Sequence, residues 1–171
     1  MPGQERTGIR IGGRSVEIAP HRCFACGSLN AGGLQLELHS AAGRCWTELR
    51  IPERFQGWDG IAHGGIVATV IDEVMAWSVI EQDNWGVTAR LSIEYKRPAP
   101  VGSLIRAEGW VVRARRRLVE TAARVIDAET GVTVATAEGL YVAAPEERKR
   151  ELKERYAFRL VDDGPPGGVV A

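Results

Sequence analysis

Apolar and polar residues alternate along the second half of the chain, in runs of the length that β-strands take. Every second position of residues 87–95 is apolar, so this strand has one apolar and one polar face. Three further strands are predicted at residues 104–113, 118–127 and 132–143, and a tight turn at residues 129–131 joins the last two. The short connections favour an antiparallel meander.

An earlier hairpin is predicted in the first third of the chain. Leu34, Leu36 and Leu38 alternate with polar residues, and a turn at residues 41–43 leads into a second strand at residues 44–51. Pro52 then ends the strand, because proline has no N–H to donate to a sheet ladder. The order of predicted core elements is therefore strand, strand, helix and four strands.

The helix lies between the hairpin and the four strands, over residues 63–82. Its apolar residues fall on every side, so the helix must be buried almost all round. A single-layer sheet provides such burial only by curling around the helix, with a second subunit or further strands closing what stays open. This predicts an α+β fold of the hotdog type, a curved antiparallel sheet wrapped around one central buried helix, in an oligomeric protein.

The two ends of the chain differ from this core. Residues 1–20 are rich in glycine and polar groups and are expected to form a loose arm with one short edge strand around residues 9–18. Residues 21–144 form the predicted hotdog domain. Residues 145–171 are expected to form a charged, solvated helix at residues 146–155 followed by a flexible tail.

Composition narrows the range of partners. The 171 residues contain 22 Lys and Arg against 22 Asp and Glu, so the broad basic surface of a nucleic-acid-binding protein is not expected. No apolar run reaches the length of a membrane span, and the first twenty residues contain no apolar core of a signal peptide. The three cysteines are an odd number, which fits a reducing compartment. We therefore expect a cytoplasmic protein with neither nucleic-acid nor membrane partners.

A motif at the start of the predicted helix carries a family resemblance. His63-Gly64-Gly65 is followed by Asp72 nine positions after the histidine, and Thr88 lies sixteen positions beyond Asp72. Together with residues 87–98 and the prelude Cys23-Phe24-Ala25-Cys26-Gly27, this pattern resembles hotdog acyl-CoA thioesterases of the phenylacetate-degradation type, over roughly residues 23–143. The resemblance implies hydrolysis of an acyl-CoA, a homodimer or a dimer-of-dimers tetramer, and a site whose turn and acid come from different subunits.

The chemistry needs an oxyanion site and a base. Backbone N–H groups at the helix start, at Gly64 and Gly65, can hold the oxyanion, although plain turn geometry also explains both glycines. Asp72 lies in an apolar helix and is the candidate general base or nucleophile; the alternative is a paired, structural carboxylate, which is the role expected for Glu73. Adjacent helix positions differ by about 100 degrees, so only one of these two acids should be catalytic.

Further site residues follow from the same resemblance. Thr88 is predicted on the polar face of its strand, opposite Leu91, where its hydroxyl would hold water or orient Asp72 or else simply face solvent. His63 would support the turn or join substrate binding. Many relatives carry an Asn six residues before this histidine, where this chain has Gly57, so Gln56 is the candidate to supply the amide.

Several cationic residues are candidates for binding the phosphate groups of coenzyme A. An arginine cluster at a predicted hairpin and two cations before a proline-rich loop can each reach a phosphate, although solvated turns are also charged. The candidate substrate-binding cations are Arg90, Lys96, Arg97, Arg115 and Arg116.

Cys23 and Cys26 have the spacing of metal ligands, but they form only half of a structural zinc site. Further ligands could come from His21, His39 or Cys45. A second complete pair is absent from the sequence, so no metal or cofactor is expected.

Two other functions remain open at this level. Gly57 in place of the asparagine is compatible with an acyl-CoA-binding or regulatory hotdog protein that hydrolyses nothing. A hotdog dehydratase ranks third, because it would need a histidine paired with an acid at the reacting carbon. The acyl group, the choice between dimer and tetramer, and the choice between base and nucleophile for Asp72 are not determined by these residues.

Overall fold

The apolar segment after His63 forms the central helix, α1 (Gly64–Glu81), in a computed structural model that describes residues 7–11 and 14–162. His63 is the N-cap, and its side chain accepts a hydrogen bond from the backbone N–H of Gly65. The residues that α1 buries lie on several sides of the helix, as the sequence pattern requires. They are Val67, Val70, Ile71, Val74, Met75, Trp77, Ser78 and Val79.

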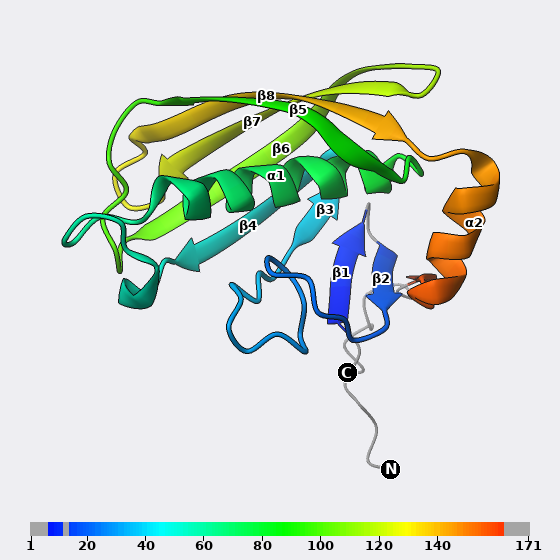
Figure 1. The fold of residues 1–171 in the computed structure, drawn as a ribbon, viewed down its shortest axis with the longest axis horizontal. Helices are drawn as coiled ribbons and strands as arrows, with labels where there is room; N and C mark the ends of the chain where they lie inside the picture. The colour runs from blue at the N-terminus through cyan, green and yellow to red at the C-terminus, as the bar shows by residue number, and fades with distance from the viewer. Residues whose placement is uncertain (1–6, 12–13, 163–171) are drawn as a thin grey trace, which may run out of the picture.

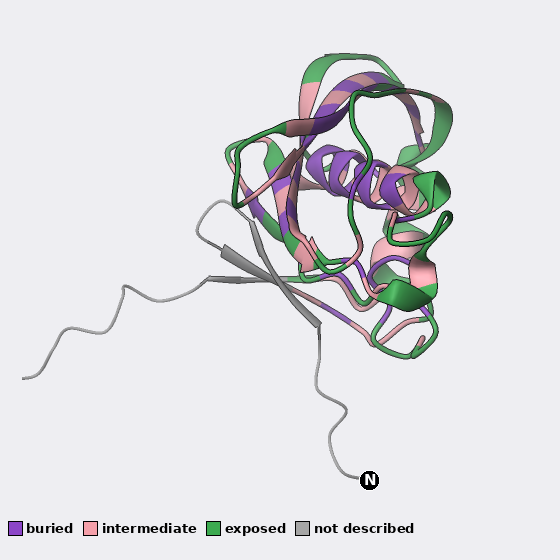
Figure 2. Ribbon diagram, turned by 90° about the vertical axis from the view of Figure 1, so that its left-hand side faces the viewer, coloured by how far each residue is buried: buried purple, intermediate pink, exposed green. Residues whose placement is uncertain are grey.

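The described strands form one sheet that curls around α1 (Figures 1 and 2). Its order is β5-β8-β7-β6-β4-β3-β1-β2-β9. The strands are β1 (Thr7–Ile11), β2 (Arg14–Ile18), β3 (His39–Ala41), β4 (Arg44–Arg50), β5 (Gly86–Tyr95), β6 (Leu104–Arg115), β7 (Leu118–Asp127), β8 (Thr133–Ala143) and β9 (Arg159–Asp162). A short 3-10 helix at Glu53–Phe55 precedes α1. This architecture confirms the predicted hotdog fold.

The predicted four-strand meander was wrong in one connection. β6, β7 and β8 follow one another as antiparallel neighbours, but β5 pairs with β8 and not with β6. The segment after β5 therefore crosses to the far side of the meander before β6 begins, and β5 is left at the edge of the sheet. Alternation along a strand records which face is buried and carries no information about its neighbours.

The first predicted strand was also wrong in length. Only His39–Ala41 pairs with β4, and residues 34–38 form no ladder. The backbone N–H groups of Leu34 and Leu36 instead donate to the carbonyls of Phe24 and Ala25, at 2.8 and 2.9 Å. The alternating leucines thus mark an irregular segment, with a left-handed residue at Gln35, whose leucine side chains pack into the core while its backbone holds the loop at residues 23–27.

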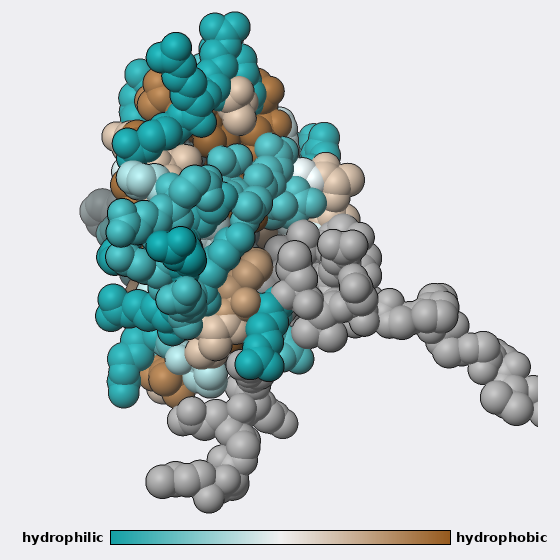
Figure 3. Space-filling model, turned by 90° about the vertical axis from the view of Figure 1, so that its right-hand side faces the viewer, coloured by the Kyte–Doolittle hydropathy of each residue, from teal (hydrophilic) through white to brown (hydrophobic). Residues whose placement is uncertain are grey.

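The chain ends add strands that the sequence pattern did not resolve. The N-terminal arm contains two paired strands, β1 and β2, where one edge strand was expected, and β2 also pairs with β9. The charged segment forms α2 (Glu146–Arg155), which has no buried residue and lies on the largely hydrophilic side shown in Figure 3. Beyond Asp162, the predicted tail lies outside the described residues. None of the described helices has both the length and the apolar character needed to cross a membrane.

Candidate active site

Asp72, in the middle of α1, is held by two hydroxyl groups from the sheet. Thr88 on β5 donates to Oδ1 of Asp72 at 2.8 Å, and Tyr141 on β8 donates to the same oxygen at 2.7 Å. The Tyr141 hydroxyl also lies 3.0 Å from the backbone oxygen of Asp72. Burial raises the pKa of Tyr141 well above its usual range, so this hydroxyl remains a donor. Oδ2 of Asp72 accepts no hydrogen bond from any described residue and is available to a reactant.

A β-bulge turns Thr88 toward the helix. The register between β5 and β8 shifts between Thr88 and Arg90, so Ala89 is an extra residue on β5. Thr88 consequently faces the same side as Leu91, and the two line one hollow. The predicted placement of Thr88 on the opposite face from Leu91 was therefore wrong, because a strict period of two fails wherever a residue is inserted into one strand.

The hollow in front of Asp72 is open to solvent and has a volume of about 380 Å³. It lies where the loop after Pro20, helix α1 and the edge strand β5 meet. Its lining is mostly apolar apart from the acids and Thr88. The lining residues are Cys23, Phe24, Ala25, Ala68, Thr69, Asp72, Glu73, Thr88 and Leu91.

Glu73 borders the same hollow but is engaged with different groups. Trp77 donates its indole N–H to Oε1 of Glu73 at 2.9 Å, and Sγ of Cys23 lies 3.9 Å from Oε2. Burial, followed by the charge of Cys23, raises the pKa of Glu73 to about 7. Hydrogen bonding from the Cys26 side chain lowers the pKa of Cys23 to about 5. Both oxygens of Glu73 thus have neighbours on the protein side, in contrast to Asp72.

The start of α1 leaves one backbone donor free. The N–H of Gly65 donates to Nδ1 of His63 at 2.9 Å, and the N–H groups of the next two residues point to the His63 carbonyl. Gly64 donates its N–H to no described residue, while its carbonyl accepts a hydrogen bond from Tyr95 at 2.7 Å. Of the two glycines expected to bind an oxyanion, Gly64 therefore presents the open donor, and Gly65 is occupied by the cap.

Gly64 and Asp72 cannot act on the same carbonyl within one chain. They are eight residues apart on one helix, and a rise of 1.5 Å per residue separates them by about 12 Å along the axis. An oxyanion donor must lie about 3 Å from the carbonyl oxygen, and a general base can be removed from the carbonyl carbon by no more than the attacking water molecule, so the two groups would have to lie much closer together. The structure therefore separates the two halves of the expected site.

Gly57, where many relatives carry an asparagine, lies in the loop before α1 and close to His63. A side chain at Gly57 would begin 3.2 Å from Cα and 3.3 Å from Cδ2 of His63, so this glycine makes room for the capping histidine. Gln56 accepts a hydrogen bond from the N–H of Gly60 at 3.2 Å. Its side-chain oxygen thus closes the loop at residues 56–60.

The candidate cations fall into separate groups. Lys96 and Arg97 line a second hollow, of about 400 Å³, together with the exposed Trp58 and with Gly64. Arg115 and Arg116 lie at the tip of the β6–β7 hairpin, at the other end of the sheet (Figure 1).

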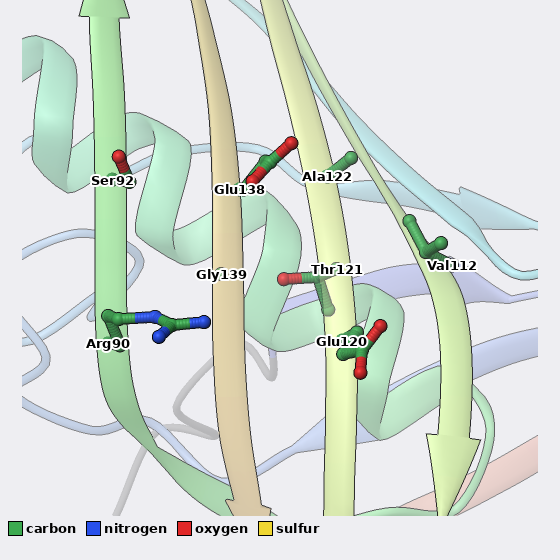
Figure 4. A pocket seen from close by; sticks show the side chains of 8 residues that line it. All are labelled: Arg90, Ser92, Val112, Glu120, Thr121, Ala122, Glu138 and Gly139. Atoms are coloured by element: carbon green, nitrogen blue, oxygen red, sulfur yellow. The ribbon is translucent and has the colours of Figure 1, made fainter.

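Arg90 lies on the outer face of the sheet, with α1 behind it, in a hollow of about 470 Å³ that also contains Glu120 and Glu138 (Figure 4). Two other arginines of the hairpin have protein partners. Arg113 pairs with Glu120 at 2.5 Å, and Arg117 donates to the Ala143 carbonyl at 2.8 Å.

Tyr141 was missed by the sequence reasoning. It lies 69 residues from Asp72, and its place in an apolar strand indicated only that it is inward-facing. Its contact with Asp72 becomes visible only in the folded structure, where β8 packs against α1. Trp77 and Met75, on α1, are buried in the core, as apolar residues of a central helix usually are.

The fold and the site agree with a family match. Residues 59–134, which span α1 and strands β5 to β7, match the family model described as Thioesterase superfamily. The match covers less than half of the chain.

Two known proteins with similar sequences are both named as acyl-CoA thioesterases. Mouse acyl-coenzyme A thioesterase THEM4 is 34% identical over 84 residues, which are 48% of this chain and 36% of THEM4. Human acyl-coenzyme A thioesterase 13 is 29% identical over 98 residues, which are 56% of this chain and 70% of that protein. The chain thus spans about a third of the first relative and more than two thirds of the second.

Solved structures share the fold. Protein RHA08564, described as a thioesterase superfamily protein, has a TM-score of 0.67 at 27% identity, covering 71% of this chain and 60% of its own. The PaaI protein of the E. coli phenylacetic acid degradation operon has a TM-score of 0.62 at 18% identity, covering 66% of this chain and 81% of that chain. The structure of smu.793 from Streptococcus mutans UA159, solved bound to acetyl CoA, has a TM-score of 0.57 at 22% identity, covering 60% of this chain and 82% of that chain. At their identities, the last two show the fold alone.

Proposed function

We propose that this protein hydrolyses an acyl-CoA thioester to the free acid and coenzyme A. The observation that carries the proposal is the Asp72 carboxylate, which lines an open, mostly apolar hollow. Its Oδ1 is held by two hydroxyls, while Oδ2 accepts no hydrogen bond from any described residue. A base needs this combination of a fixed orientation and a free oxygen. The spacing of His63, Asp72 and Thr88 supports kinship with the phenylacetate-degradation type.

In the proposed reaction, Asp72 acts as a general base. Oδ2 takes a proton from a water molecule as the water oxygen forms a bond to the thioester carbon. The resulting tetrahedral intermediate then expels the coenzyme A sulfur as a thiolate, which takes up the proton held by Oδ2 and so returns Asp72 to its carboxylate form. Thr88 and Tyr141 keep the carboxylate in place through the hydrogen bonds to Oδ1. A direct attack by Asp72, with a mixed anhydride as intermediate, uses the same oxygen.

The oxyanion would be held by a second copy of the chain. Gly64 has the free N–H, at the positive end of the α1 dipole, but lies too far from Asp72 of its own chain. The edge strand β5 has one unpaired side next to the Asp72 hollow, and Val87 on this strand is 71% exposed. Such an edge invites pairing with another strand. A two-fold arrangement would bring the α1 start of one chain toward Asp72 of its partner.

The second hollow fits the coenzyme. Lys96 and Arg97 flank the same helix start that provides the free N–H, and the exposed Trp58 offers an aromatic face beside them. Phosphate groups favour such cations, and a planar base can stack on an indole. We therefore propose that coenzyme A lies along this hollow, with the thioester directed at the partner's Asp72 hollow.

The first experiment is a screen of the purified protein against short-chain, long-chain and aromatic acyl-CoA thioesters. A thiol reagent records released coenzyme A. We expect hydrolysis of at least one member, with turnover that needs no added cofactor. Tight binding of acyl-CoA without release of thiol would favour the regulatory alternative and contradict the enzyme.

Thr88→Val is expected to lower turnover by roughly tenfold to hundredfold, because a hydrogen bond to a charged group contributes about 1.5–3 kcal/mol. Valine keeps the shape and strand propensity of the residue and removes only the hydroxyl that holds Asp72. Thr88→Ser restores the donor and should recover most of the activity. Full turnover by the valine variant would show that the hydrogen bond from Thr88 to Asp72 is not needed for hydrolysis.

Oligomerisation is tested by complementation. Light scattering should give a mass of at least two chains. Asp72→Asn and Gly64→Pro, each nearly inactive alone, should regain up to about a quarter of wild-type turnover when co-refolded, since half of the dimers are mixed and each mixed dimer contains one intact site. A site formed within one chain would regain nothing, and an active monomer would contradict the shared site.

A further inference from the structure

Three possible metal ligands from distant parts of the chain meet behind the Asp72 hollow. Sγ of Cys23, Sγ of Cys26 and a carboxylate oxygen of Glu73 all lie within 4.8 Å of one another. A tetrahedral zinc ion binds sulfur at about 2.3 Å and oxygen at about 2.0–2.2 Å, so two of its ligand atoms lie roughly 3.3–3.8 Å apart. The 3.9 Å between Cys23 and Glu73 is close to this spacing. The C-x-x-C pair thus gains a third ligand that its sequence spacing did not reveal.

His21 adds a nitrogen at one corner of the cluster. Nε2 lies 3.3 Å from Sγ of Cys26, and the ring packs edge-on against Tyr156. On its other side, Nδ1 lies 3.2 Å from the carbonyl oxygen of Ala19. A proton on Nδ1 would satisfy that carbonyl and leave the lone pair of Nε2 directed at the cysteine, which is the arrangement of metal-binding histidines. His21 does not belong to the group of three that lie mutually within 4.8 Å, so it contacts the cluster through Cys26.

The groups around the cluster orient the other ligands as well. The indole N–H of Trp77 holds Oε1 of Glu73 and leaves Oε2 facing Cys23. At Gly27, a Cβ would lie 2.4 Å from the backbone nitrogen and 2.5 Å from the backbone oxygen of Cys23, so the chain can turn this tightly only with glycine. The N–H of Gly27 closes the turn on the Cys23 carbonyl at 3.0 Å. Such outer contacts fix ligand geometry before an ion binds.

We infer that the chain binds one divalent metal ion, with Zn²⁺ the best match, through Cys23, Cys26 and Glu73, with His21 as the fourth ligand. Two thiolates, an imidazole and a carboxylate form a ligand set that suits zinc in tetrahedral geometry. Phe24 and Ala25 lie between the two cysteines and form one wall of the Asp72 hollow. The ion therefore ties this wall to α1, and the proposed hydrolysis takes no step through it.

Cobalt(II) is the probe for this site, because its bonds to thiolates give a charge-transfer absorption that does not depend on enzymatic activity. The full-length protein, reduced and freed of metal by a chelator, is titrated with Co²⁺ and then with Zn²⁺. We expect one equivalent of Co²⁺ per chain, with the thiolate band, and loss of the band on addition of one equivalent of Zn²⁺. Asp72→Asn should behave as the wild type does.

The three cysteines provide a matched comparison. Cys23→Ser should lose the thiolate band, whereas Cys45→Ala, at the buried cysteine of β4, should keep it. His21→Ala and Glu73→Gln should each weaken Co²⁺ binding at least tenfold. These two variants test the site even if the serine variant fails to fold, which circular dichroism would reveal.

A folded, reduced wild-type protein without the cobalt band would overturn the site, as would an unchanged band in Cys23→Ser. Loss of two titratable thiols per chain without added oxidant would show a disulfide between Cys23 and Cys26 in place of an ion, and would overturn it too. None of these outcomes bears on thioester hydrolysis, so the failure of one proposal is distinguishable from the failure of the other.

Discussion

Asp72→Asn is expected to lower turnover by roughly a hundredfold to ten-thousandfold, the usual contribution of a positioned proton transfer. The amide oxygen of the new side chain can still accept the hydrogen bonds from Thr88 and Tyr141, so the variant should remain folded and oligomeric. Only the free, basic oxygen is removed. The measurement is steady-state hydrolysis of the preferred acyl-CoA, together with circular dichroism and light scattering.

Glu73→Gln is the matched control, because the two acids are neighbours on α1 and border the same hollow. The pKa of Glu73 is raised to about 7, which by itself would suit a base. Geometry favours Asp72, since the oxygens of Glu73 face Trp77 and Cys23. We expect Glu73→Gln to lower turnover by less than about tenfold at equal metal content. Equal losses at both positions would reject the assignment, and a larger loss at Glu73 would transfer the role of base to it.

Gly64→Pro is expected to lower turnover by roughly a hundredfold to a thousandfold, the effect of removing one oxyanion donor. Proline suits this position, which is the first residue of α1, because its fixed φ is helical and only the N–H is lost. His63 before it is already extended, at φ −62° and ψ 132°, as a residue before proline should be. The variant therefore deletes one donor with little change in backbone. Hydrolysis and acyl-CoA binding are measured together.

Gly64→Ala distinguishes the contribution of the Gly64 N–H from that of the open space left by the missing side chain. An added Cβ would lie 3.6 Å from the Tyr95 ring, which is ordinary contact, and the N–H is kept. The alanine variant should retain most of the turnover that the proline variant loses. Similar losses in both would indicate that the open space at Gly64, and not its N–H, is what the reaction needs.

The hydrophobic pattern determined the bounds of most core elements to within a residue or two, although not the place of β5 in the sheet. A helix that is apolar on every side can only be central, and α1 begins and ends one residue inside the predicted bounds of 63–82. Strand β7 (Leu118–Asp127) and helix α2 (Glu146–Arg155) have their predicted bounds. These features are local, because the burial of one face of a strand or one side of a helix requires apolar residues at the spacing of that element.

Asp72 and Thr88 could also be singled out from the sequence, since their spacing on either side of the helix end carries the family resemblance. Their contact at 2.8 Å could not, because it depends on the extra residue at Ala89 that turns Thr88 toward α1. An insertion of one residue into a ladder leaves no mark that distinguishes it from ordinary alternation. The capping of Gly65 by His63 agrees with the first of the two roles expected for this histidine, support of the turn, and the choice of this role depends on a single side-chain orientation.

The sequence by itself thus determined a buried helix and its curled sheet, and it supplied the candidate residues for chemistry. Only the tertiary structure decided which of them meet. Packing of β8 against α1 brings Tyr141 to Asp72, pairing of β8 with β5 places Thr88 beside Tyr141, and the loop after Pro20 brings Cys23 and Cys26 to Glu73. Such contacts join residues about 50 to 70 positions apart in the sequence. They arise when the whole sheet packs around one helix, and the hydrophobic period of a single strand or helix contains no information about them.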